Sequence, residues 1–356
     1  MTPGFLPSEL PLVAAPMAGG ATTVALAGAA SAAGAFPFLA GGYKTAAGLA
    51  AEVDALREQT DAFGVNLFVP DSARAKAAAR ERVDRAAFAA YAASLEAEAA
   101  AYGVPLDPVP VADVEDWGAK MALLREHPVP VVSLTFGLPA ARDIAALRRG
   151  GSAVLATVTT AAEARAAADA GVDALVVQGP RAGGHSATWD PRRRIADAAT
   201  AAVLAAVHAE VLAEVRPASR LPLIAAGGVD GPEAVRELLA CGASAVAVGT
   251  MLLRTDEAGT SPTHRAALTA EQFTETVGTR AFTGRPARAL RNGFIDRHGP
   301  HEITAYPAVH HLTRELRGRA GAAGDSDRLH LWAGTGYRSA RSEPVADTFA
   351  RLARGL

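Results

Sequence analysis

The sequence predicts an α/β protein, a TIM (β/α)₈ barrel with an additional, mainly helical C-terminal domain. Eight short apolar runs recur between residues 11 and 250, and most lead through a glycine-rich or polar loop into an Ala-rich stretch. Buried strands that alternate with helices form parallel sheets, and eight such units favour a closed barrel over an open sheet. A chain of 356 residues is long enough for a barrel and a further domain, although two α/β domains would also fit that length.

Each predicted strand is a short β-branched or apolar run that ends in glycine, proline or a polar residue. The helix predicted at 159–170 has Thr159 or Thr160 as its N-cap and ends before Gly171. The eight predicted strands cover residues 11–17, 34–42, 63–70, 129–137, 152–158, 173–179, 221–228 and 244–250.

A second helix with clear end signals is predicted at 230–240. Asp230 is its expected N-cap, and Pro232 stands in the first turn, where a missing N–H costs nothing. Cys241 follows the helix, and we expect a small buried side chain there rather than a nucleophile. As the single cysteine, it excludes an internal disulfide framework and any cluster of cysteine metal ligands.

The chain departs from the strand–helix alternation in two places. Residues 71–101 are rich in Ala, Arg and Glu, and we expect one or two additional amphipathic helices there. After Thr250, polar turns and Gly-rich loops replace the repeating pattern. We therefore predict a barrel over residues 1–255 and a mainly helical cap or substrate domain over 256–356, with a final helix near 343–354.

Composition argues against several classes of partner. The formal net charge is −2, which gives no reason to expect nucleic acid or an anionic membrane as a partner. Residues 10–43 carry no charge, but they are mostly Ala and Gly, contain three prolines and follow Glu9 rather than a basic cluster. We therefore expect no membrane span, and without a recognisable signal peptide we expect a cytoplasmic protein.

Glycines stand at the ends of the last two predicted strands. Gly227 and Gly228 end one strand, and Gly249 with Thr250 ends the next. Without Cβ atoms, backbone amides at these positions can approach an anion closely, and the carboxyl ends of strands seven and eight are where barrels commonly bind phosphate. Plain turn chemistry is the alternative, but two such ends in neighbouring strands favour a phosphate site.

Two amide side chains end otherwise apolar strands. Asn66 and Gln178 can each donate and accept hydrogen bonds, and a buried amide without partners costs about 1–3 kcal/mol. Alternating donors and acceptors suit a flat heterocycle such as a flavin. The alternative is that each amide bonds to the backbone of a neighbouring loop.

The stretch "QGPRAGGHSATW" presents a histidine after two glycines. Gly183 and Gly184 allow a tight turn beside a large planar ligand, so we expect His185 to be delivered over it. An imidazole can act there as base, acid or hydrogen-bond donor at neutral pH, although a histidine in such a loop can also simply be exposed.

Other candidate side chains follow residue 300. His310 and His311 could bind a metal, but no acidic or cysteine partner stands at ligand spacing, so we expect no metal site. Three aromatic residues either line the pocket or pack the cap, and we favour packing: Tyr306, Trp332 and Tyr337.

Several of these motifs together resemble the nitronate monooxygenases. The resemblance is carried by "PLVAAPMAGG", "FGVNLFVP", "VVQGPRAGGHSATW", "LPLIAAGGV", "AVAVGTMLLRTDEA", "ITAYPAVHHLTRELR" and "GDSDRLHLWAGTGYRSAR". It implies a TIM barrel that holds FMN non-covalently, with Pro16 and Met17 against the ring and His185 as the active-site histidine. The other FMN contacts that it implies are Asn66, Gln178, Gly183, Gly228, Ala247, Val248, Gly249 and Thr250, to which the phosphate argument adds Gly227.

The resemblance also implies an activity. Members of the family oxidise alkyl nitronates such as propionate 3-nitronate with O₂, giving a carbonyl compound and nitrite. Because a nitronate is already an anion, the imidazole would mainly orient it and compensate its charge, and proton abstraction would matter only for a neutral nitroalkane. Barrels of this kind often pair, so a homodimer is one expectation, although the sequence leaves the oligomeric state open.

The histidine loop departs from the common form of the family. Arg181 stands where a glutamate is usual, and Ser186 with Ala187 stands where Arg-Gly is frequent. Replacing an anion with a cation beside the active loop would reverse the local electrostatic bias. Our hypothesis is that this change favours anionic substrates or alters a partner interaction.

Two other functions fit the same sequence features. Flavin-dependent enoyl-carrier-protein and quinone reductases are similar in their FMN motifs and use NAD(P)H without a separate G-x-G-x-x-G fingerprint. A flavin-free, phosphate-binding barrel is the second alternative, but it gives no role to His185.

Overall fold

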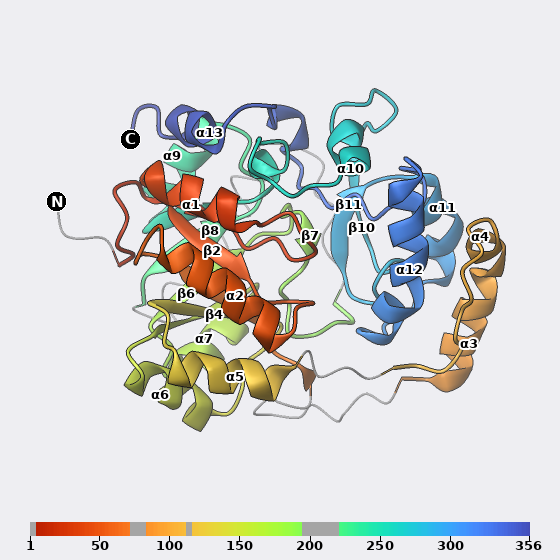
Figure 1. Cartoon of the computed structure of the whole chain (residues 1–356), viewed down its shortest axis with the longest axis horizontal. Helices are drawn as coiled ribbons and strands as arrows, with labels where there is room; N and C mark the ends of the chain where they lie inside the picture. The colour runs from red at the N-terminus through yellow and green to blue at the C-terminus, as the bar shows by residue number, and fades with distance from the viewer. Residues whose placement is uncertain (1–4, 72–82, 112–115, 194–220) are drawn as a thin grey trace.

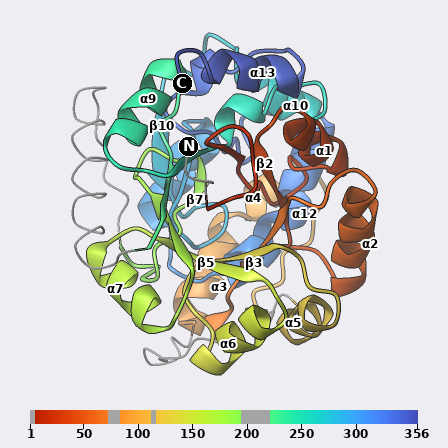
Figure 2. The same ribbon diagram turned by 90° about the vertical axis from the view of Figure 1, so that its left-hand side faces the viewer.

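The computed structural model describes residues 5–71, 83–111, 116–193 and 221–356. Its centre is a closed barrel of eight parallel strands, and Figures 1 and 2 show helices arranged around it. In order around the barrel, the strands are β1 (Leu12–Ala14), β2 (Phe36–Ala40), β3 (Gly64–Phe68), β4 (Val131–Thr135), β5 (Ala153–Val158), β6 (Ala174–Gln178), β8 (Leu223–Ala226) and β9 (Ala245–Val248).

The TIM barrel predicted from the sequence is confirmed, and each predicted strand contains an observed one. Successive side chains on a strand point to opposite faces, so each strand supplies two layers. One layer, which includes Val13, Phe36 and Leu155, fills the barrel interior. The other packs against the surrounding helices, which explains why the strands are apolar throughout.

Most of the surrounding helices lie between consecutive strands, and the last one comes from the end of the chain. That final helix, predicted near 343–354, packs Val345, Phe349 and Leu352 into the barrel's outer core. The outer helices are α1 (Val24–Ala32), α2 (Ala46–Arg57), α5 (Trp117–Glu126), α6 (Ala141–Arg149), α7 (Ala161–Asp169), α9 (Pro232–Ala240) and α13 (Val345–Leu352).

The residues at two helix ends can be compared with those predicted from the sequence. At α7, the hydroxyl of Thr160 accepts from the backbone N–H of Glu163 at 3.1 Å, as the sequence predicts. At α9, the prediction of Asp230 is wrong, because Gly231 occupies the N-cap and no side chain bonds to the helix start. The predicted burial of Cys241 is also wrong: the residue is the C-cap of α9 and is exposed, because the chain leaves the helix there.

Two helices follow β3 on an excursion away from the barrel. They are α3 (Arg85–Ser94) and α4 (Glu96–Ala100), and they match the extra helices expected in 71–101; residues 72–82 lie outside the described ranges. Phe88 and Tyr91 of α3 pack in one cluster with Phe282 and Phe294, and the Tyr91 hydroxyl donates to the carbonyl of Ala281 at 2.5 Å. This excursion therefore packs with the C-terminal part of the chain, to the right of the barrel in Figure 1.

We use "cap" for α3 and α4 together with residues 262–332. Besides helices, the cap contains a three-stranded antiparallel sheet in the order β10–β11–β7, which the sequence did not predict. Strand β7 (Gly184–His185) belongs to the loop after β6, so the cap sheet holds the predicted active loop directly. Between residues 262 and 332, the α-helices and strands of the cap are α10 (Pro262–Ala267), β10 (Thr276–Thr279), β11 (Ala287–Leu290), α11 (Gly293–His298) and α12 (Ala308–Ala322).

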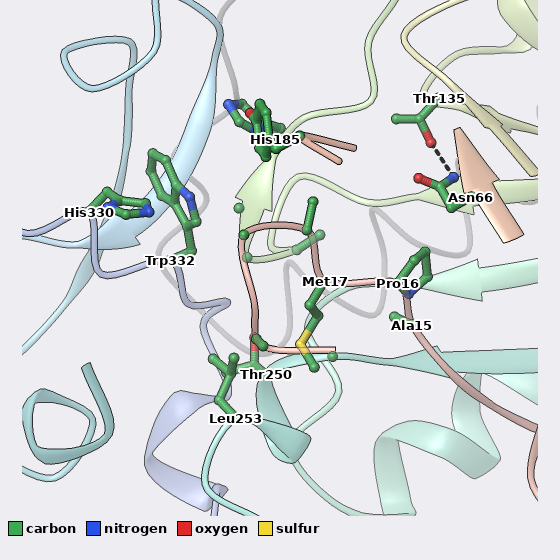
Figure 3. Close-up of a pocket in the computed structure, with 18 of the residues that line it drawn as sticks. Ala15, Pro16, Met17, Asn66, Thr135, His185, Thr250, Leu253, His330 and Trp332 are labelled. Carbon is green, nitrogen blue, oxygen red and sulfur yellow. Dashed lines mark hydrogen bonds between the residues drawn. The ribbon is translucent and has the colours of Figure 1, made fainter. Parts of the chain in front are cut away.

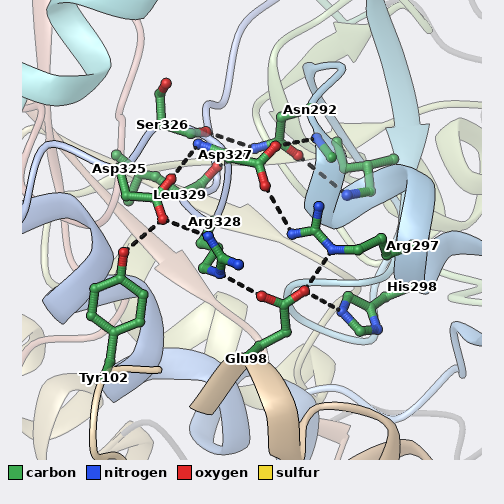
Figure 4. A network of polar contacts seen from close by, with 12 residues as sticks. Glu98, Tyr102, Asn292, Arg297, His298, Asp325, Ser326, Asp327, Arg328 and Leu329 are labelled. Carbon is green, nitrogen blue, oxygen red and sulfur yellow. Dashed lines mark hydrogen bonds and ion pairs between the residues drawn. The ribbon is translucent and has the colours of Figure 1, made fainter. Parts of the chain in front are cut away.

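A polar network fastens α4 to the rest of the cap (Figure 4). The carboxylate of Glu98 accepts from Arg297 at 2.6 Å, lies 3.2 Å from the Nε2 atom of His298 and also pairs with Arg328. Asp325 in turn accepts from Arg328 and from the hydroxyl of Tyr102, each within 2.8 Å.

Within the described ranges, no helix is long and apolar enough to cross a membrane. The division at residue 255 stays a prediction.

Candidate active site

A cavity of about 950 Å³ lies between the carboxyl ends of the barrel strands and the cap (Figure 3). Its lining comes from the loops after most barrel strands and from α10 and α12 of the cap. The structure brings nearly all the predicted site residues together there: Pro16, Met17, Asn66, Gln178, Gly183, His185, Gly227, Gly228, Ala247, Gly249 and Thr250.

Val248 is the exception among the predicted site residues. Its side chain is buried in the layer between strands and helices, whereas that of Ala247 belongs to the barrel interior. The difference follows from the alternation of side chains along β9. Val248 could therefore take part in the site only through its main chain, and its contact with the cofactor stays a prediction.

The glycines form a backbone wall on one side of the cavity. Gly227 and Gly228 have φ values of 101° and 76°, a region that side-chain-bearing residues rarely adopt. A Cβ on Gly227 would lie 2.8 Å from the Cβ of Ala182, so the loops after β6 and β8 can touch only because glycine stands there. At Gly249, a Cβ would point at the Sδ atom of Met17 from 3.7 Å. Main chain, rather than side chains, thus faces the cavity along this wall.

The two predicted amide side chains are held differently. Gln178 donates to the carbonyl of His185 at 3.2 Å and accepts from the backbone N–H of Ala187 at 2.7 Å. It therefore fixes the histidine loop, which is the loop-backbone alternative left open by the sequence. Asn66 donates to the hydroxyls of Ser133 and Thr135, each at 2.8 Å, and Figure 3 shows its oxygen on the other side of the amide.

His185 is surrounded by aromatic rings on the cap side of the cavity. Its ring centroid lies 5.8 Å from that of Phe136, 5.7 Å from that of Tyr306 and 5.5 Å from that of Trp332. The Nε2 atom is 2.9 Å from the hydroxyl of Thr283. The backbone of His185 pairs with that of Ala287 in the cap sheet, so the ring is positioned by the cap as much as by the barrel.

The environment of His185 favours the neutral imidazole. Its removal from bulk water, followed by the charges of Arg285 and Arg317, lowers the pKa to about 3. At neutral pH the ring can therefore accept a proton or form hydrogen bonds, but it carries no charge. The sequence led us to expect this histidine to orient an anionic substrate and compensate its charge, and that role stays a prediction. The positive charges that act on the ring belong to Arg285 and Arg317.

Arg285 contributes to this environment from behind Phe136. Its Cζ atom lies 3.8 Å from the centroid of the Phe136 ring, and its Nη2 atom donates to the carbonyl of Thr188. Phe136 has a φ of 78°, an outlier for a bulky side chain that costs of the order of 1–3 kcal/mol. This strained backbone conformation, directly after β4, turns the Phe136 ring towards His185.

Sequence reasoning missed most of the cap side of the cavity. The signal was available in "AVHHLTRELRG", where a helical period places residues 310, 314 and 317 on one face, but the orientation of that helix is a tertiary property. The additional lining residues include Tyr43, Lys44, His264, His310, His311, Arg314, Arg317, His330 and Trp332.

The three aromatic residues expected to pack the cap behave differently from one another. Trp332 lines the cavity, and Tyr306 contacts His185, so packing alone does not describe either of them. Tyr337 is buried and donates to the carbonyl of Phe273 at 2.7 Å, as a packing residue would.

Arg181 lies behind the histidine loop and is almost fully buried. Burial lowers its pKa, and the neighbouring charge of Asp230 opposes that change. Its backbone carbonyl accepts from Thr335 at 3.2 Å. Because Arg181 does not line the cavity, its charge cannot act on a bound substrate by direct contact.

The residues that the structure describes contain no group of three or more His, Cys, Asp or Glu side chains arranged to hold a metal ion. His310 instead stacks on Tyr43, with centroids 4.2 Å apart and planes within 3°.

Comparisons with known proteins agree over nearly the whole chain. A family model described as nitronate monooxygenase matches residues 6–354. A probable nitronate monooxygenase of Staphylococcus aureus (strain Newman) is 30% identical over 346 residues, which cover 96% of this chain and 92% of that protein. One of Staphylococcus saprophyticus is 31% identical over 338 residues, 94% of this chain and 91% of its own length.

Solved structures show the same likeness. The nitroalkane oxidase from Streptomyces ansochromogenes has a TM-score of 0.87 and 44% identity, over 97% of this chain and 95% of that chain. FabK from Thermotoga maritima has a TM-score of 0.70 at 24% identity, over 98% of this chain and 92% of that chain, and it shows the shared fold alone.

Proposed function

The chain belongs to the nitronate monooxygenase family, and we propose that it oxidises alkyl nitronates with O₂, using FMN bound in the cavity at the barrel mouth. The protein is an oxidoreductase. The products would be a carbonyl compound and nitrite, with propionate 3-nitronate as one candidate substrate. The observation that carries this proposal is a single cavity with a glycine backbone wall on one side and a neutral His185 on the other.

The residues present fit FMN. The cavity lies within the size range of cofactor pockets, at the end of the barrel where such sites form. The left-handed turn at Gly227 and Gly228, with Gly249 on the next strand, leaves main chain open to a phosphate. We propose that the ring lies against Pro16 and Met17. The remaining proposed contacts are Asn66, Gln178, Gly183, Ala247, Thr250 and the backbone of Val248.

The bound cofactor would supply the redox chemistry, accepting electrons from the nitronate and passing them to O₂. The protein's own groups bind, orient and exclude water. Phe136, Tyr306 and Trp332 surround His185 and keep bulk water from the reacting carbon. With a neutral nitroalkane, the uncharged imidazole would accept the proton from the carbon next to the nitro group.

An anionic nitronate needs no proton removal, and the cations of the cap would attract it. Arg317 and Arg314 line the cavity on that side, so the positive charge is present even though His185 is neutral. This arrangement accommodates the anion without the imidazolium that the sequence led us to expect.

Absorption spectroscopy and an oxygen electrode test the proposal. The purified protein should be yellow, should release FMN on denaturation, and should consume O₂ and form nitrite when a preformed alkyl nitronate is added. A protein that stays colourless in the presence of FMN, or one that binds FMN but consumes no O₂ with any alkyl nitronate, would contradict it.

A further inference from the structure

Thr283 is the side chain that holds the imidazole of His185 from the cap. It lies in the connection between β10 and β11, is 1% exposed and lines the cavity. Its hydroxyl is 2.9 Å from the Nε2 atom of His185. Among the residues that the structure describes, this is the one hydrogen bond that the imidazole makes.

The backbones that carry these two residues are joined by the cap sheet. His185 of β7 pairs with Ala287 of β11, a few residues after Thr283. The turn that contains Thr283 is fixed on its other side by Ala305, whose N–H donates to the carbonyl of Gly284 at 3.1 Å. A Cβ on Gly284 would lie 2.7 Å from the carbonyl carbon of Ala305, so the two segments pack closely. The hydroxyl and the ring are thus held together before any ligand binds.

The hydroxyl of Thr283 has three polar contacts. Besides the Nε2 atom of His185, it lies 3.4 Å from the backbone nitrogen of Arg285 and 3.3 Å from the carbonyl oxygen of the same residue. A hydroxyl donates one hydrogen bond and accepts two. All three contacts are satisfied together only when the hydroxyl donates to the carbonyl and accepts from both nitrogens.

This count decides between the two neutral tautomers of His185. If the hydroxyl donated to Nε2, its single proton would no longer be available to the carbonyl of Arg285, and the ring proton would be on Nδ1. With the ring proton on Nε2, the same groups make one more hydrogen bond. Each such bond contributes to stability, so the tautomer protonated on Nε2 is favoured.

The Nδ1 atom of His185 is left for a ligand. It makes no hydrogen bond to the described residues, and it is not enclosed by protein in the way that the Nε2 atom of His264 is. Because His185 lines the cavity, Nδ1 is the ring nitrogen that can meet a bound molecule. In the favoured tautomer, this atom offers a lone pair rather than an N–H.

We propose that Thr283 is a positioning residue, which holds His185 as the tautomer protonated on Nε2 and leaves Nδ1 to accept the proton of a neutral nitroalkane. The C–H bond next to the nitro group breaks, its electron pair moves into the nitro group to form the nitronate, and the proton forms the Nδ1–H bond. The new positive charge of the ring then lies beside the new negative charge of the nitronate. The proton transfer rests on the proposed function, but the tautomer does not.

Nitrogen NMR of the FMN-loaded protein, labelled at its histidines, tests the tautomer without turnover. Long-range proton–nitrogen correlation spectra distinguish a protonated ring nitrogen from an unprotonated one, and His185→Asn identifies the signals of this ring by removing them. The wild type should show Nε2 protonated and Nδ1 unprotonated. Thr283→Val keeps the shape of the side chain but removes the hydroxyl, and it should lose this pattern because the Nε2–H no longer has its acceptor.

Steady-state kinetics with a neutral nitroalkane and with its preformed nitronate test the role in proton transfer. Thr283→Val should lower kcat/KM for the nitroalkane by about five- to tenfold, the effect of losing one hydrogen bond, and should change kcat/KM for the nitronate by less than about twofold. Thr283→Ser keeps the hydroxyl and should restore both values. Equal losses on both forms would show a structural role only and would overturn the inference.

Thr279→Val is the matched control. Thr279 is also buried in the cap sheet, and its hydroxyl likewise accepts from the N–H two residues along the chain, that of Ala281 at 3.0 Å. It donates to Glu302 at 3.0 Å, however, and does not line the cavity. The control should leave both the tautomer of His185 and the ratio of the two kcat/KM values unchanged. If Thr283→Val does not fold, Thr283→Ala removes the same hydroxyl.

The spectra also separate this inference from the proposed function. A wild-type ring protonated on Nδ1, or a tautomer that stays unchanged when the Thr283 hydroxyl is removed, would overturn the inference while nitronate oxidation stands. A tautomer that depends on Thr283, in a protein that oxidises no nitronate, would support the positioning role and refute the proposed function.

Discussion

His185 and His298 are two enclosed histidines of the same structure, placed in opposite electrostatic settings. His298 lies 3.2 Å from Glu98, in a network where the carboxylate is matched by Arg297 and Arg328 (Figure 4). The charged groups that act on His185 are two cations, Arg285 and Arg317 (Figure 3 shows its cavity). We call the network of Glu98, Arg297, His298 and Arg328 the joint of the cap. The joint contains both positive and negative charges, whereas the charged groups that act on His185 in the cavity are positive.

The difference separates stability from function. The buried carboxylate of Glu98 is matched by partly exposed arginines, and these contacts fasten α4 to the cap. The cations near His185 instead attract anions and keep the imidazole neutral. Substitutions in the two regions should therefore affect different measurements.

The largest expected effect comes from His185→Asn, which removes the proposed base. With a neutral nitroalkane, kcat/KM should fall by about 10²- to 10⁴-fold, because proton removal from carbon loses its acceptor. With the preformed nitronate the loss should be much smaller. Steady-state kinetics with both forms of one compound provide the measurement, and exposed His127, replaced by Asn, is the control. Equal losses on both forms would rule out a base.

Glu98→Gln should have the next largest effect, on stability rather than turnover. Arg297 and Arg328 are partly exposed, and each keeps a second carboxylate partner. Losing the buried charge of Glu98 should therefore cost about 1.5–3 kcal/mol in the free energy of unfolding, the range for hydrogen bonds to a charged group. Urea denaturation measures this cost. Glu315→Gln, which breaks an exposed pair with Arg319, should cost about 0.5 kcal/mol or less. A Glu98 variant no less stable than this control would contradict our account of the joint.

The pH dependence of stability provides a second test of the joint. Burial alone would raise the pKa of Glu98, but hydrogen bonds from Arg297, His298 and Arg328 lower it overall. A carboxylate with a lowered folded-state pKa stabilises the fold above its unfolded pKa, and this contribution is lost as the pH falls through the folded value. The stability difference between wild type and Glu98→Gln should therefore shrink in acid.

Gln178→Ala should have an intermediate effect on catalysis. The amide holds both the carbonyl of His185 and the N–H of Ala187, and displacing a reacting group by about 1 Å can cost on the order of 100-fold in rate. We expect kcat to fall by up to about 100-fold. The contribution of the Glu98 network to the free energy of unfolding should not change. Gln59→Ala, at an exposed amide, is the comparison. An unchanged kcat would show that the loop does not depend on this amide.

The smallest effect is expected from Arg285→Met, as a shift in a pH profile. With a pKa of about 3, His185 is in its neutral, base form at all pH values well above 3. The profile of kcat/KM against pH for a neutral nitroalkane should therefore have no acidic limb from His185 between about pH 5 and 8. Removing the cation should raise the pKa towards its ordinary value and move the acidic limb upward. A wild-type limb near pH 6.5 would contradict the neutral-histidine account.

The sequence was sufficient to predict the barrel, because each strand is apolar on both faces and its end is marked by glycine or a polar residue. It also located Asn66, Gln178 and His185, since the carboxyl ends of barrel strands meet at one face. Alternation along β9 could have separated Ala247 from Val248, but the motif was interpreted as one continuous run.

The cap side of the cavity could not be predicted in the same way. Arg317 and His310 lie on a helix whose orientation depends on packing with α3 and the cap sheet, contacts between residues far apart in sequence. Strand β7 is likewise two residues long and exists only because β11 lies beside it. The predicted homodimer is a separate matter, which sedimentation of the FMN-loaded protein would decide.

Anaerobic mixing of the FMN-loaded protein is the most direct test of the central claim. An alkyl nitronate alone should bleach the flavin absorbance within the time of turnover, and NADH or NADPH should not. Rapid bleaching by a reduced nicotinamide, with no response to any nitronate, would identify a reductase instead and contradict the account.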